Sequence, residues 1–157
     1  MKSKLIHEAG GERTFVLVYE TDDPIVQLLE RFVTEHKVGA ARFTAIGALS
    51  AATLGYFDWD TKKYAEIPVS RQVEVLSLIG DVALKGDQPA IHAHIVVGKS
   101  DGSTQGGHLM EAHVRPTLEL VLVESPLHLH KKVDPESGLA LIVLDNPETN
   151  TPEPLDV

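Results

Sequence analysis

The chain has 157 residues, of which 43% are hydrophobic, so it is long enough to form one domain with a sizeable core. It contains no cysteine, which excludes disulfides, thiolate metal sites, cysteine-ligated iron–sulfur clusters and a cysteine nucleophile. The formal net charge of −9 is opposite to the basic surface with which proteins bind nucleic-acid phosphates. No apolar run approaches the roughly 18 residues of a membrane span, and the N-terminus lacks an apolar signal region, so we expect a cytoplasmic protein.

The first predicted elements are a strand and a helix. β-Branched and aromatic residues favour a strand over residues 14–19. Asp23 and Pro24 are typical of a helix start, with aspartate as the N-cap and proline in the first turn. The apolar residues after them recur at intervals of three and four residues: Ile25, Leu28, Leu29, Phe32 and Val33. This spacing predicts an amphipathic helix that ends before Gly39.

The rest of the chain has the pattern of consecutive strands. We expect them at residues 41–46, 52–57, 63–67, 73–84, 90–97, 117–123 and 139–144. The segment 47–50 is short enough to join the first two of these as a hairpin turn. One helix and about eight strands predict an α+β fold in which an antiparallel or mixed sheet packs against the helix. We assign residues 13–145 to one domain, between an N-terminal segment, 1–12, and a mobile proline-rich tail, 146–157.

Three histidines form the most informative motif in the chain. His92 and His94 are two residues apart, so their side chains lie on the same face of a strand. The run 99–103 has the composition of a tight turn, and the chain that leaves it can bring His108, which follows two glycines, back beside the pair. Three neutral imidazoles at one point suit a divalent transition metal, usually zinc, with a fourth position left for water or another ligand.

Several acids could support such a site. Asp101, Glu111 and Glu119 are available to hold the spare ring nitrogens of metal-bound histidines. A water on the metal would have its pKa lowered toward about 7 and could act as a nucleophile, which indicates hydrolysis or hydration as the chemistry. A second histidine pair, His128 and His130, is interpreted as surface. Residues 98–102 form the one Gly-x-Ser-x-Gly run, but they fall in the predicted turn and not between a strand and a helix, which argues against serine-hydrolase chemistry. The chain has no P-loop or GxGxxG motif, which argues against nucleotide chemistry.

Five segments of the chain form a further pattern: residues 46–57, 73–80, 92–94, 106–109 and 117–119. Taken in order, they resemble the PPC domain, the plants and prokaryotes conserved domain. The resemblance implies an antiparallel sheet packed against a helix and a homotrimeric assembly. In some prokaryotic members three histidines hold a metal, commonly zinc, and His92, His94 and His108 occupy those positions here. Because the last segment matches a family motif, Glu119 is the candidate catalytic base.

The same resemblance raises a DNA-binding alternative. Plant members of the family bind AT-rich DNA through AT-hook segments ahead of the domain. This chain has no Arg-Gly-Arg-Pro core, and Gln72 stands where the plant pattern has arginine. The leading hypothesis is therefore a trimeric metal-binding protein with a small anionic ligand or water at the open position, whether or not it is an enzyme. The alternatives are a DNA-binding regulatory protein of the family and a non-catalytic structural trimer.

Overall fold

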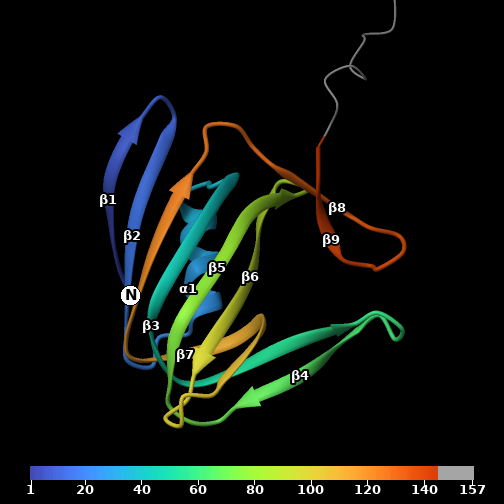
Figure 1. Cartoon of the computed structure of the whole chain (residues 1–157). Coiled ribbons are helices and arrows are strands. Elements are labelled where there is room, and N and C mark those ends of the chain that lie inside the picture. Colours follow the sequence, from blue (N-terminus) through green and yellow to red (C-terminus); the bar gives the residue numbers. More distant parts are fainter. Residues whose placement is uncertain (145–157) are drawn as a thin grey trace, which may run out of the picture.

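Strands dominate the computed structural model, which describes residues 1–144 (Figure 1). In chain order the elements are β1 (Lys2–Ala9), β2 (Glu12–Glu20), α1 (Ile25–Glu35), β3 (Ala40–Asp58), β4 (Lys63–Val69), β5 (Val73–Lys85), β6 (Gln88–Gly98), β7 (Thr104–Glu124), β8 (His130–Val133) and β9 (Ala140–Val143). The predicted tail, 146–157, lies outside the described residues.

The nine strands found within residues 1–144 belong to one sheet. Its order is β1-β2-β7-β3-β5-β8-β9, with β4 paired to β3 and β6 paired to both β5 and β7. The strand pairs are antiparallel except β5 and β8, which run parallel. The predicted class, a mixed sheet packed against one main helix, is therefore confirmed. The N-terminal segment is part of this sheet as β1, which pairs with β2.

Strands β3 and β7 are the longest, and both change partners along their length. The first part of β3 pairs with β5, the second part pairs with β4, and both parts pair with β7. The segment 47–50, which we expected to be a hairpin turn, lies inside β3. Gly47 has a φ of 153°, and a Cβ at this position would collide with the carbonyl oxygen of Thr117 on β7. Here glycine permits a close approach of two strands instead of a reversal of the chain.

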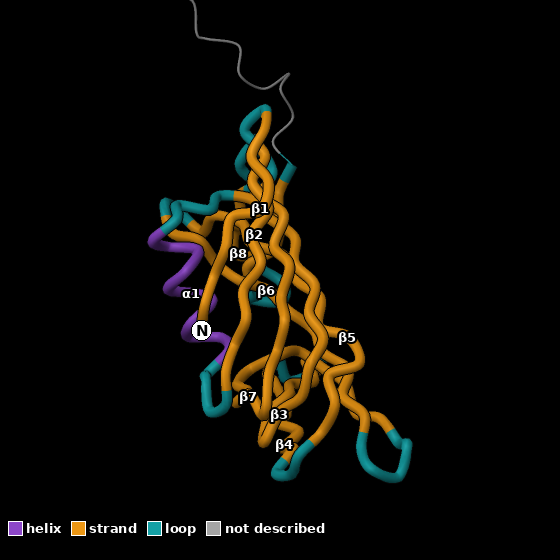
Figure 2. The backbone as a smooth tube through the Cα atoms, turned by 90° about the vertical axis from the view of Figure 1, so that its left-hand side faces the viewer, coloured by secondary structure: helices purple, strands orange, loops and turns teal. Residues whose placement is uncertain are grey.

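Helix α1 lies on one side of the sheet (Figure 2). Its buried residues repeat at helical spacing: Ile25, Leu29, Phe32 and Val33. The expected N-cap is wrong by one residue, because Pro24 takes that position and no side chain caps the helix. The carboxylate of Asp23 instead accepts a hydrogen bond from the backbone N–H of Glu20. Within residues 1–144 no helix is long and apolar enough to cross a membrane.

The core fills the space between α1 and the sheet face that it covers. Along β7, Leu118, Leu120 and Leu122 are completely buried, whereas the side chains of Glu119 and Val121 are exposed. This alternation follows from the period of two in an extended strand. Burial of one such leucine contributes about 1.5–3 kcal/mol, so this face of the sheet supplies much of the stability of the fold.

The opposite face of the same sheet has no covering element among residues 1–144 (Figure 2). It carries exposed apolar side chains, which we call the uncovered face: Ile46, Leu76, Ile79, Val96 and Val121. Strand pairing makes them neighbours, since Thr44 of β3 lies between Ile79 of β5 and Val121 of β7. The uncovered face is therefore rich in exposed apolar side chains, with polar residues such as Thr44 among them.

Candidate metal centre

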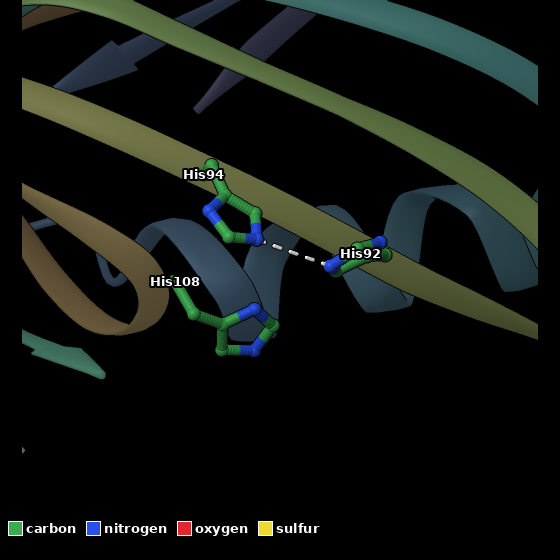
Figure 3. A group of neighbouring side chains, drawn as sticks. All are labelled: His92, His94 and His108. Atoms are coloured by element: carbon green, nitrogen blue, oxygen red, sulfur yellow. Dashed lines mark hydrogen bonds between the residues drawn. The ribbon is translucent and has the colours of Figure 1, made fainter. Parts of the chain in front are cut away.

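The three predicted histidines come together where β6 meets β7 (Figure 3). His92 and His94 lie on β6, and His108 on β7 lies directly opposite His94. Opposed residues of an antiparallel pair share a face, as do residues two apart on one strand, so the three rings lie on the same side. Each ring offers a nitrogen that lies within 4.8 Å of those of the other two. We call this group the histidine triad.

The turn between the two strands sets this register. Asp101 accepts hydrogen bonds from the backbone N–H and the hydroxyl of Ser103, at 2.9 and 2.6 Å. The N–H of Lys99 donates to the carbonyl of Ser103 at 2.8 Å, which closes the predicted turn. In a hairpin the turn geometry fixes which residues face each other, and here it brings His108 opposite His94. Asp101, which we expected to support a histidine ring, builds the turn instead.

The geometry of the triad fits a metal ion. The Nε2 atoms of His92 and His94 are 3.2 Å apart. Two nitrogens bound to one zinc ion at about 2.0–2.1 Å in tetrahedral geometry would be about 3.3 Å apart. The Nδ1 atom of His108 is buried and has no hydrogen-bond partner among residues 1–144. Such an orphaned buried group costs about 1–3 kcal/mol, and a cation between the rings would give it a partner.

The protonation state of the triad also suits metal binding. Burial, with smaller contributions from His92 and His94, lowers the pKa of His108 to about 4. Burial lowers the pKa of His94 as well, with a contribution from His92. Both rings are therefore neutral at neutral pH, and neutral imidazole is the form that binds a metal.

Asp81 on β5 supports the triad from outside. It lies opposite His92 in the β5–β6 pair, and its Oδ2 is 3.5 Å from Nδ1 of His92. On its other side, Oδ1 lies 2.7 Å from Nζ of Lys131, whose side chain is buried. A proton on Nδ1 of His92 facing this carboxylate leaves the lone pair of Nε2 directed at the other two rings. Sequence reasoning missed both Asp81 and Lys131.

A signal for Asp81 was nevertheless present in the sequence. Gly86 and Asp87 have the composition of a two-residue hairpin turn. Counting back equally on both sides of that turn places Asp81 opposite His92, which is the register observed. Lys131 has no comparable signal, because β8 is four residues long and joins β5 in parallel from a distant part of the chain.

The other predicted residues lie elsewhere. Glu111 pairs with His113, with 3.2 Å between Oε1 and Nε2. Glu119 is eleven residues beyond His108, on the arm of β7 that pairs with β2 (Figure 1). The expectation that Asp101, Glu111 or Glu119 holds a ring of the triad is therefore corrected in favour of Asp81. The catalytic role of Glu119 stays a prediction. Residues 128 and 130, the second histidine pair, are exposed as expected.

Fold and triad together define a sheet protein with a candidate metal centre. Comparison with known families identifies the family to which this protein belongs. The family model of the Plants and Prokaryotes Conserved (PCC) domain matches residues 6–126. The chain belongs to this family, and the resemblance based on the five sequence segments is confirmed.

Individual relatives carry different descriptions. A metal-containing protein from Archaeoglobus fulgidus has a solved structure that is 33% identical, with a TM-score of 0.78 over 92% of this chain and 100% of that one. A candidate DNA-binding protein from Bacteroides thetaiotaomicron is 27% identical, with a TM-score of 0.79 over 87% and 94%. The bifunctional protein GlmU of Synechococcus sp. strain JA-3-3Ab is 32% identical over 146 residues, or 91% of this chain. The chain spans 22% of the length of that GlmU protein.

Proposed function

We propose that this PCC-domain protein binds a divalent transition metal, such as zinc, through His92, His94 and His108. The convergence of the three rings carries the proposal, together with the buried Nδ1 of His108, which has no hydrogen-bond partner among residues 1–144. The relative from Archaeoglobus fulgidus, described as metal-containing, supports it. A metal held by three imidazoles supplies a Lewis acid with an open position for a small ligand, and hydrolysis is the class of reaction that such a centre serves.

The surrounding residues prepare the site for an anion. Asp81 orients the ring of His92, and Lys131 offsets the charge of Asp81. Because the three ligands themselves are uncharged, the bound ion keeps its positive charge. The occupant of the open position is therefore a small anionic ligand or water.

The assembly that we propose is a homotrimer formed through the uncovered face. Ile46 and Ile79 on this face are 62% and 55% exposed, and exposed apolar surfaces of this kind mark protein interfaces. Ile79 lies opposite His94 in the β5–β6 pair, so the triad borders the same surface. Assembly through this face would place the metal centre next to the subunit interface. A cytoplasmic location stays a prediction.

Elemental analysis of protein purified without an affinity tag tests the metal proposal. We expect about one metal ion per chain in the wild type and loss of it in His92→Ala/His94→Ala. The double variant His128→Ala/His130→Ala is the matched control, because it removes an exposed pair with the same spacing. Absence of metal after reconstitution, or metal that survives in the triad variant, contradicts the proposal. A metal-free wild type that is still trimeric would favour the purely structural trimer.

DNA binding is the second candidate, because the relative from Bacteroides thetaiotaomicron is described as a candidate DNA-binding protein. The net charge of −9 opposes it. Retention on immobilised duplex DNA that weakens steeply as salt rises would support this role, since phosphate contacts release counterions. Absence of retention at low salt would exclude it.

A further inference from the structure

A cavity of about 340 Å³ adjoins the histidine triad. It lies where β6 and β7 separate: the two strands pair from Gly98 and Thr104 as far as His94 and His108. Beyond this point β6 continues beside β5, and β7 continues beside β3. Helix α1 borders the gap and lies behind the triad in Figure 3.

The lining of the cavity is mostly apolar. Nine of its twelve lining residues are hydrophobic, and they include the buried side chains of Leu29, Phe43 and Leu78. Its polar lining consists of Glu30, Tyr64 and His108. An apolar protein cavity of about 150 Å³ is enough to bind benzene, so this cavity has room for a substituted ring or a branched chain.

His108 connects the cavity to the triad, because it belongs to both. The ring of Tyr64 lies beside it, with 5.0 Å between the ring centroids. A molecule that fills the cavity therefore contacts His108, one of the three rings of the triad. Its end at His108 would lie next to a bound cation, which favours anionic oxygen, while the rest would meet hydrocarbon walls that favour an apolar body.

From this juxtaposition, and resting on the proposed metal centre, we infer that the ligand is a monocarboxylic acid with a ring-sized or branched hydrocarbon body. Its carboxylate binds at the triad and its hydrocarbon body fills the cavity beside α1. Acetate has the carboxylate but no hydrocarbon body large enough to fill the cavity, so it binds more weakly than an acid that has both.

Calorimetric titration of zinc-loaded protein with phenylacetate and with acetate tests the inference. We expect phenylacetate to bind at least about tenfold more tightly, because its ring is removed from water. Val26→Phe narrows the cavity, since Val26 is partly buried and lines it. This variant should keep its zinc and its acetate affinity and lose the preference for phenylacetate. Gln27→Phe adds the same ring at the next, exposed position of α1 and should behave as the wild type.

Zinc content, measured on the same samples, separates the possible failures. Zinc-loaded wild type that binds both acids equally overturns the ligand assignment and leaves the metal proposal standing. Wild type that retains no zinc overturns the metal proposal and with it the carboxylate contact. A preference that persists in Val26→Phe overturns the cavity assignment. If Val26→Phe does not fold, Met110→Phe at the more exposed edge of the cavity serves the same test.

Discussion

The two faces of strand β6 differ in what they do. Ala93 and Ile95 point into the core and are almost completely buried, whereas His92 and His94 alternate with them on the outside. Core packing on one face thus fixes the positions of the ring nitrogens on the other. A ligand set built on a packed strand is held more precisely than one on a loop. The comparison indicates that core packing is concentrated on the covered face, whereas the ring nitrogens of His92 and His94 lie on the uncovered one.

The largest expected effect is on the covered face. Leu120→Ala should lower the free energy of unfolding by about 2–5 kcal/mol, because it leaves a cavity at a completely buried position. Leu127→Ala removes the same atoms from a side chain that is 79% exposed, and it should change the free energy of unfolding by less than about 0.5 kcal/mol. Urea unfolding at equal protein concentration measures both. Similar losses in the two variants would contradict the assignment of the core.

The next effect concerns assembly through the uncovered face. Ile79→Asp places a charge in the proposed apolar interface, where its desolvation is costly, so the trimer should dissociate into folded monomers. Sedimentation velocity measures the mass, and circular dichroism checks the fold. Leu141→Asp, on β9 and also exposed, should leave the trimer intact. A wild type that is monomeric, or an Ile79→Asp variant that remains trimeric, would refute assembly through this face.

A smaller effect is expected for the residue that orients His92. Asp81→Asn should weaken zinc affinity about 10- to 100-fold, as expected when the carboxylate partner of a metal-bound histidine is removed. Competition with a chromophoric chelator gives the affinity. Asp101→Asn is the control, because the structure places Asp101 in the β6–β7 turn. If the two variants weaken zinc equally, Asp81 has no special role.

The smallest effect is on acid stability of the metal-free protein. The pKa of His108 is about 4 in the folded chain, below the 6.5 of an ordinary histidine, so between these pH values the unfolded chain binds a proton that the folded chain does not. Stability is therefore fully present above pH 6.5 and falls as the pH decreases toward 4. His108→Gln removes this contribution and should lose less stability over the same window. Urea unfolding midpoints of both proteins, measured at several pH values between 6.5 and 4, test this expectation. If the midpoints of wild type and variant fall in parallel as the pH decreases, the burial of His108 is contradicted.

Local patterns predicted the parts of the fold that depend on alternation or helical spacing. The helix and the core side of β7 follow directly from such patterns, and the triad follows from the spacing of His92 and His94 plus a turn. Strand β1 was not predicted because all its residues are exposed, so no buried face repeats along it. The error at Gly47 arose because glycine permits either a turn or a close strand approach, and β7 decides which one forms. The Asp81–Lys131 pair could not be predicted because no local pattern shows that β8 joins β5.

X-ray absorption at the zinc edge of the zinc-loaded protein tests the central claim most directly. The account predicts three imidazole nitrogens at about 2.0–2.1 Å together with one further light-atom ligand, and loss of one imidazole in His108→Gln. A zinc ion coordinated by oxygen alone, or by fewer than three imidazoles in the wild type, would contradict the assignment of the triad as the metal centre.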